Sequence, residues 1–279
     1  MSAQTREIPL AAADGHEWKL IAVLPAQPRA ALLWLPALGV AAKHYLPFAE
    51  TLAERGIAVY LHEWRGLGSS NLRPDRENDW AYREILEADL PQSHAAMAQA
   101  HAGIAHCIGG HSLGGQLATC FAALQAGAFA QLWLVASGTP YWRAFPAPLR
   151  WGLPLLYRFL PWLAQRRGRL NGRRLRFGGM ESRGLIRDWA RVGLSGVYRA
   201  TGMEDTLLES ALSQLAIPIH GVALEKDWMA PRDSLVALTG KLAPAQSKII
   251  VLNSRQLGAR ADHFTWMKQP GSVVDCLLE

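Results

Sequence analysis

Short apolar runs bounded by turn residues recur along the chain and predict a series of β-strands. They are EWKLIAVLP, ALLWLP, IAVYLHEW, IAHCIGG, QLWLVASG, IPIHGVAL and KIIVLNS. Between several of them the apolar positions follow the 3.6-residue period of a helix, as in HYLPFAETLAERG, REILEADLPQSHAAMAQAHAG and GGQLATCFAALQAGA. Strands that alternate with helices indicate βαβ units. We therefore predict an α/β fold, with a mostly parallel central sheet flanked by helices.

Two departures from this alternation predict a hairpin at one edge of the sheet and a segment inserted between two strands. The first two strand candidates, near residues 6–25, are separated only by ADGH, so we expect them to pair as an antiparallel hairpin at one edge of the sheet. The alternation stops near residue 139 and resumes near residue 216. Residues 1–138 and 216–279 are therefore predicted to form the core, and residues 139–215 a helical cap inserted into it. The prolines of its first half are expected to divide that half into short helices or turns: Pro146, Pro148, Pro154 and Pro161.

One turn between a predicted strand and a predicted helix carries a serine among glycines. IAHCIGG ends the strand, LGGQLA begins the helix, and Gly110-His111-Ser112-Leu113-Gly114 matches the pattern G-x-S-x-G. A Cβ at Gly110 or Gly114 would collide with the neighbouring strand or helix. The glycines therefore permit a sharp turn that leaves the Ser112 hydroxyl exposed above the sheet. We predict Ser112 as a nucleophile.

A serine hydroxyl is a weak nucleophile at neutral pH and needs a base that is itself oriented by an acid. In a fold of this kind, the acid and then the base follow the serine along the chain. Asp227 lies in the polar turn after the strand PIHGVAL, and His263 lies in the loop after IIVLNS. We predict Asp227 as the acid and His263 as the base. Glu225, in the same turn as Asp227, is the alternative acid.

The other histidines are not predicted to act as the base. Four of them are expected to be structural, because they lie on the helix outside the sheet, just after it or inside a strand: His94, His101, His106 and His220. His111 is expected to point away from the site, whereas His44 and His62 lie near the active edge, within reach of a substrate.

An oxyanion formed by attack of the serine needs two backbone N–H donors. We expect one from Leu113, the residue after the nucleophile, and one from Leu38 in the loop LPALGVAAKHY, where Gly39 permits a tight turn. The alternative interpretation of that loop is an ordinary glycine turn.

Over nearly its whole length the chain resembles the α/β-hydrolase superfamily. PALGVAAKHYLPFAETLAERGIAVYLHEWRGLGSS, GHSLGGQLA and PIHGVALEKDWMAP look like a bacterial group of hydrolases close to the serine aminopeptidase and monoacylglycerol-lipase-like branch. The members of this group usually carry His-Gly before the oxyanion residue and Asp before the RG-x-G-x-S loop. Here these positions are Pro36-Ala37 and Glu63, so what supports the oxyanion loop is left open.

Composition and the remaining motifs narrow the function classes. Half of the 279 residues are hydrophobic, three cysteines are too few for a disulfide framework, and no apolar run approaches a membrane span or a secretory signal. We therefore expect a cytoplasmic protein. RGLGSS lacks the full G-x-G-x-x-G pattern, and His62-Glu63 lacks the second histidine of a zinc-peptidase helix, so neither a cofactor nor a metal is predicted.

The predicted function is that of a serine hydrolase that cleaves a small-molecule carboxylic ester or thioester through an acyl-enzyme intermediate. Two alternatives remain open. An acyltransferase would use the same Ser-His-Asp triad, and a protein that binds ligands without catalysis would keep the same fold.

Residues 141–191 carry twelve Arg against Glu181 and Asp188, and the rest of the chain is net acidic. Aromatic and aliphatic residues are interleaved with these arginines: Trp142, Phe145, Trp151, Leu155, Leu156, Phe159, Leu160 and Trp162. In one interpretation, they cover the active site and pack on the sheet while the Arg side chains extend to solvent. In the other, part of this surface meets an anionic membrane or an acidic substrate such as a phospholipid or acyl-CoA. Nucleic acid is not expected as a partner, because nothing else in the chain resembles a nucleic-acid module.

Overall fold

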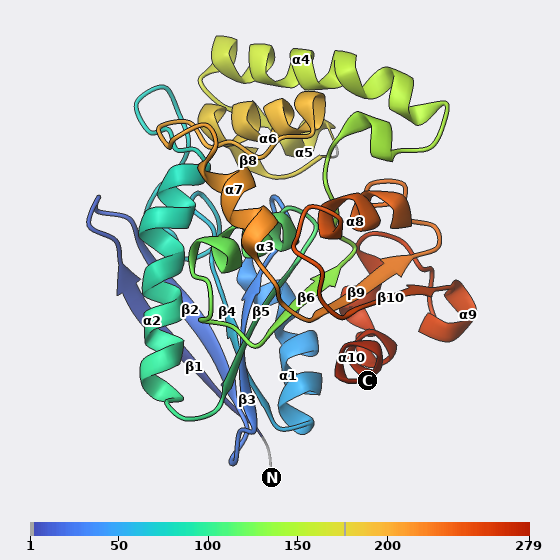
Figure 1. Cartoon of the computed structure of the whole chain (residues 1–279). Helices are drawn as coiled ribbons and strands as arrows, with labels where there is room; N and C mark the ends of the chain where they lie inside the picture. Colours follow the sequence, from blue (N-terminus) through green and yellow to red (C-terminus); the bar gives the residue numbers. More distant parts are fainter. Residues whose placement is uncertain (1–2, 176) are drawn as a thin grey trace.

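The computed structural model describes residues 3–175 and 177–279, and within them an eight-stranded sheet forms the centre of the molecule (Figure 1). Its strands are β1 (Gln4–Ala11), β2 (Glu17–Leu24), β3 (Ala30–Leu35), β4 (Ile57–Leu61), β5 (Ala105–His111), β6 (Gln131–Val135), β9 (Ile219–Leu224) and β10 (Ser247–Leu252). The order in the sheet is β1-β2-β4-β3-β5-β6-β9-β10. β2 runs antiparallel to both of its neighbours, and all other pairs are parallel. The predicted fold class, the predicted strands and the edge hairpin are confirmed.

Helices cover both faces of the sheet because its central strands are apolar on both sides. In β3, Leu33 and Leu35 face one core, and Leu32 and Trp34 face the other. The first core is closed by α2 (Leu90–Ala100), α3 (Leu113–Leu124), α7 (Leu207–Gln214) and α8 (Arg232–Thr239). The second is closed by α1 (Leu46–Glu54) and α10 (Gly271–Leu278). Shorter helical pieces are η1 (Ala42–Tyr45), the π-helical η2 (Glu84–Asp89), α9 (Ser254–Leu257) and η4 (Thr265–Lys268).

The 139–215 segment connects β6 to β9 and lies over the end of the sheet at which the parallel strands finish (Figure 1). It contains η3 (Trp142–Ala144), α4 (Leu149–Arg167), β7 (Leu170–Asn171), α5 (Gly172–Leu175), β8 (Met180–Glu181), α6 (Arg183–Ser195) and α7. β7 and β8 pair as a small antiparallel hairpin, and α4 packs on α6. Arg176, one of the twelve arginines counted in the sequence, lies outside the described residues.

The prediction that prolines divide the first half of this segment is wrong for Pro154 and Pro161, which both lie inside the continuous helix α4. A proline in a helix interior removes a hydrogen bond and costs about 3 kcal/mol. Here this cost is offset by burial of the inner face of the helix, whose members are Leu153, Tyr157, Leu160 and Ala164.

Because those four residues fill the inner face, the outer aromatic residues of α4 cannot also pack inward. The first interpretation of the aromatic residues is therefore wrong for Trp151, Leu155, Phe159 and Trp162, which are exposed, whereas Phe145 and Leu160 are buried. Among the described residues, no helix is both long enough and apolar enough to span a membrane.

Candidate active site

Ser112 occupies the sharp turn between β5 and α3, with backbone angles φ 56° and ψ −121°. A non-glycine residue at positive φ is strained, and such strain persists only where the surrounding structure holds it. A Cβ at Gly110 would lie 2.3 Å from the carbonyl carbon of Gly114, and one at Gly114 would lie 2.1 Å from the carbonyl oxygen of Leu35. The strand and the helix can therefore meet this closely only if both positions lack a side chain.

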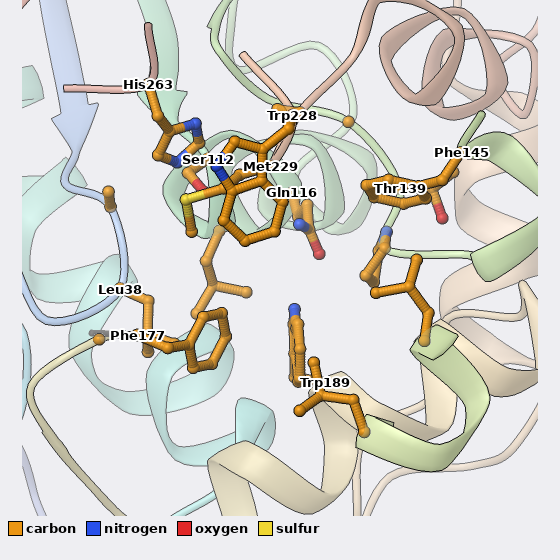
Figure 2. Close-up of a pocket in the computed structure, with 18 of the residues that line it drawn as sticks. Leu38, Ser112, Gln116, Thr139, Phe145, Phe177, Trp189, Trp228, Met229 and His263 are labelled. Atoms are coloured by element: carbon orange, nitrogen blue, oxygen red, sulfur yellow. The ribbon is translucent and has the colours of Figure 1, made fainter. Parts of the chain in front are cut away.

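His263 and Asp227 are joined by a short hydrogen bond. The imidazole Nδ1 donates to Asp227 Oδ2 at 2.7 Å, and the other carboxylate oxygen, Oδ1, accepts the backbone N–H groups of Met229 (2.8 Å) and Ala230 (3.0 Å). Both side chains are buried, whereas Glu225, the alternative acid, is exposed. The carboxylate thus fixes the ring with Nδ1 toward Asp227, which leaves Nε2 on the side of Ser112 (Figure 2).

Ser112 and His263 both line a cavity of about 780 Å³, counted with its open mouth. Its walls are mainly apolar and aromatic: Leu38, Phe145, Leu153, Leu156, Tyr157, Phe177, Trp189, Trp228, Met229 and Phe264. Gln116 and Thr139 add polar groups (Figure 2), and the lining residues that the structure describes include no Asp, Glu, Lys or Arg. The cavity therefore suits an apolar, uncharged molecule.

The two expected oxyanion donors come from different elements of the fold. Leu113 is the first residue of α3, where backbone N–H groups have no partner within the helix, and Leu38 follows β3. Both residues line the cavity, and within residues 3–175 and 177–279 neither N–H donates a hydrogen bond. The structure thus places Ser112, His263, Leu38 and Leu113 around one cavity, with Asp227 hydrogen-bonded to His263.

His111 does not line the cavity, but its ring contacts that of His263. Its ring centroid lies 4.7 Å from that of His263, and its Nδ1 lies 2.8 Å from the hydroxyl of Tyr45. That hydroxyl also accepts the N–H of Ala37 at 2.8 Å. Burial, and then the neighbouring His263, lower the pKa of His111 well below its usual value, so the ring stays neutral. Tyr45 and His111 therefore link the Leu38 loop to His263.

His44 and His62, expected near substrate, do not line the cavity. His44 is exposed on η1, and His62 is fully buried, with Nδ1 2.9 Å from the hydroxyl of Ser93. Burial lowers the pKa of His62 to about 3, so this ring is a neutral part of the core. The expectation that they touch substrate is wrong, because the His44 side chain is exposed to solvent and the His62 side chain is enclosed in the core.

Residues 26–188 match the family model described as serine aminopeptidase, S33. The chain belongs to this family. The match spans more than half of the chain, includes Ser112 and Leu38, and ends before Asp227 and His263. Membership makes this protein a hydrolase of the α/β-hydrolase superfamily.

Solved structures share the fold of this S33-family chain at low sequence identity. GrgF, an α/β hydrolase from Penicillium sp. sh18, has a TM-score of 0.65 at 15% identity, over 99% of this chain and 96% of that one. Est1E from Butyrivibrio proteoclasticus, with bound ferulic acid, has a TM-score of 0.63 at 15% identity and 96% coverage of both chains. A thermophilic esterase from Thermogutta terrifontis, with bound malate, has a TM-score of 0.61 at 20% identity, over 99% of this chain and 97% of that one. A comparison with curated proteins finds no match.

In this S33-family chain, the loop that carries Leu38 is supported by groups that the resemblance does not supply. The indole N–H of Trp64 donates to the carbonyl of Pro36 at 3.0 Å, and the carboxylate of Glu63 accepts the N–H of Ala42 at 3.1 Å. Together with Tyr45 these contacts hold both ends of the loop. These contacts therefore support the loop although Pro36-Ala37 and Glu63 replace the residues that the family usually carries. No local sequence pattern could have identified the part played by Tyr45 and Trp64.

The β7–β8 hairpin also touches the oxyanion loop of this S33 hydrolase. A Cβ at Gly39 would lie 2.1 Å from the backbone nitrogen of Gly179, so the two backbones are in direct contact. Glu181 is buried below this contact, and its Oε1 accepts the N–H of Gly179 at 2.6 Å. Burial raises the pKa of Glu181 to about 7. In the sequence, Glu181 had no role beyond balancing nearby arginines.

Proposed function

We propose that this protein is a serine hydrolase that cleaves uncharged carboxylic esters or thioesters through an acyl-enzyme. The proposal is carried by one observation, the 2.7 Å bond between Asp227 and His263 beside the strained Ser112 in the wall of one cavity. An acid, a base and a nucleophile in this order are what acyl transfer by serine needs.

The steps follow from these positions. His263 Nε2 accepts the proton of the Ser112 hydroxyl as Oγ attacks the carbonyl carbon, and Asp227 stabilises the imidazolium that forms. The N–H groups of Leu38 and Leu113 bind the oxyanion. His263 then protonates the leaving alcohol or thiol as its bond to the carbonyl carbon breaks. Water, activated in turn by His263, releases the acid from Ser112.

The cavity lining favours a neutral substrate over a peptide with a free amino terminus. An ammonium group held in an apolar cavity needs a carboxylate partner, and none lies among the described lining residues. The aromatic walls, by contrast, bury an apolar acyl or alcohol group favourably. We therefore propose esters and thioesters, with peptidase action as the outcome that the experiment below must exclude.

We also propose that residues 139–215 act as a cap on a core formed by residues 1–138 and 216–279. Leu153 and Tyr157 of α4 and Trp189 of α6 are among the residues of this segment that line the cavity. Without them the cavity would open to solvent above Ser112.

The test uses p-nitrophenyl esters of graded chain length together with aminoacyl p-nitroanilides. We expect ester hydrolysis with little amide hydrolysis, and a loss on the order of 10⁴- to 10⁶-fold in kcat for Ser112→Ala. A fluorophosphonate probe should label the wild-type protein at Ser112, and His263→Ala should abolish the labelling. Ser210→Ala, at an exposed position of α7, is the matched control and should behave like the wild type. Full turnover by Ser112→Ala, or preferential amide cleavage, would overturn the proposal.

A further inference from the structure

Helix α4 exposes large apolar side chains on the face that points toward solvent. Trp151, Leu155, Phe159 and Trp162 are 61%, 71%, 48% and 55% exposed. Their spacing of four, four and three residues places them on one helical face, as a stripe roughly 16 Å long. A helix on the surface of a globular protein normally turns charged or polar residues outward. We call this face the outer stripe of α4.

The charged residues of α4 itself all have one sign. α4 contains no acidic residue, and Arg158 and Arg166 share its outer face. Within the described residues, neither guanidinium forms an ion pair with a carboxylate. The guanidinium of Arg166 lies 5.8 Å from the ring centroid of Trp162, and that of Arg150 lies 4.7 Å from the ring of Trp151. Aromatic rings with adjacent unpaired arginines are typical of helices that lie in a lipid interface.

The position of α4 leaves this face open. Figure 1 shows α4 at the edge of the molecule, with α6 between it and the sheet. The opposite face of the same helix reaches the cavity through Leu153 and Tyr157. Leu156, which lines the cavity and is 38% exposed, lies between the two faces.

The charges on this face distinguish between two possible partners, a second copy of the chain and a lipid surface. A second copy of this chain, docked by a two-fold axis on the same face, would set arginines against arginines in an apolar contact, which is unfavourable. An anionic lipid surface offers phosphates to the guanidiniums and an acyl boundary to Trp, Phe and Leu. We infer that the outer stripe of α4 docks the protein on an anionic lipid surface. This inference does not depend on the proposed function, although together they place the cavity next to the lipid.

The experiment is co-sedimentation of the full chain with vesicles of phosphatidylcholine, alone or mixed with phosphatidylglycerol. We expect strong binding to the mixed vesicles at low salt, weak binding to phosphatidylcholine alone, and loss of binding as added salt shortens the screening length from about 10 Å at 0.1 M to about 3 Å at 1 M. Arg158→Gln/Arg166→Gln should weaken binding to the mixed vesicles roughly 10- to 30-fold. The control, Arg255→Gln/Lys268→Gln, removes two exposed cations from α9 and η4 and should leave binding close to the wild type.

A second variant tests the apolar part. Leu155→Gln/Phe159→Gln/Trp162→Gln keeps good helix formers and alters no residue of the cavity wall, so it should lose vesicle binding while its hydrolysis of a short soluble ester stays unchanged. Ser112→Ala should bind vesicles like the wild type, so failure of the proposed function would not be mistaken for failure of docking.

Three results would overturn the inference. The first is no binding to mixed vesicles at low salt. The second is an equal loss of binding in the α4 arginine variant and in the control. The third is a dimer in solution that the triple Gln variant converts to a monomer, which would make the stripe an interface between copies.

Discussion

Glu181→Gln gives a stability change whose sign and size follow from burial. The carboxyl is buried, and its pKa is raised from the ordinary 4.5 to about 7. Between these values the folded protein keeps a proton that the unfolded chain releases. The stabilising contribution of Glu181 to the free energy of unfolding is therefore complete below about pH 4.5 and is lost as the pH rises toward 7. The loss amounts to about 3 kcal/mol, because each pKa unit is about 1.4 kcal/mol.

Glutamine at this position keeps an oxygen that can accept the Gly179 N–H and carries no charge at any pH. We therefore expect Glu181→Gln to be about as stable as the wild type near pH 4.5 and about 3 kcal/mol more stable near pH 8. For a chain of this length, that difference corresponds to roughly 5 °C in Tm.

The assay is thermal unfolding of both proteins across this pH range, read as the difference in Tm between variant and wild type at each pH. Glu225→Gln, at an exposed site, is the matched control and should give a difference near zero throughout. A flat difference curve for Glu181→Gln, or a variant less stable than the wild type near pH 8, would refute the reasoning.

Two further predictions concern the nucleophile turn and the oxyanion loop. Tyr45→Phe leaves the buried N–H of Ala37 without its acceptor, which costs about 1–3 kcal/mol, and should lower kcat about tenfold with little change in KM. Steady-state kinetics on the best p-nitrophenyl ester checks this, and an unchanged kcat would show that the loop does not depend on Tyr45. Gly114→Ala would place a Cβ 2.1 Å from the Leu35 carbonyl oxygen, so little folded protein should accumulate. Soluble yield and far-UV circular dichroism measure the outcome, and a well-folded, active variant would contradict it.

The sheet and the position of Ser112 were predictable because their signals are local. An apolar strand such as β5, a pair of glycines and a helical period lie within twenty residues of one another, and each restricts the same turn. Asp227 and His263 could be placed by chain order, because parallel strands bring their carboxyl ends to one edge. The hydrogen bond between Asp227 and His263, by contrast, could be identified only in the structure.

The features that escaped prediction depend on contacts between distant residues. Tyr45 meets His111 across 66 positions, and nothing in η1 distinguishes this tyrosine from a core residue. The continuity of α4 escaped for a different reason. The local cost of Pro154 and Pro161 is visible in the sequence, whereas the burial that offsets it depends on α6.

The contact between Gly39 and Gly179 has a practical meaning for redesign of the substrate range. Two segments 140 positions apart meet there, and a Cβ at Gly39 would lie 2.1 Å from the backbone nitrogen of Gly179, so any side chain introduced at Gly39 would force the loop that carries Leu38 to shift. A library aimed at the substrate range should therefore keep Gly39 fixed. Leu153, Leu156 and Phe145 also line the cavity but are not among the nearest neighbours of Gly39 or Gly179, so they are the positions at which variation can alter selectivity while this contact is kept.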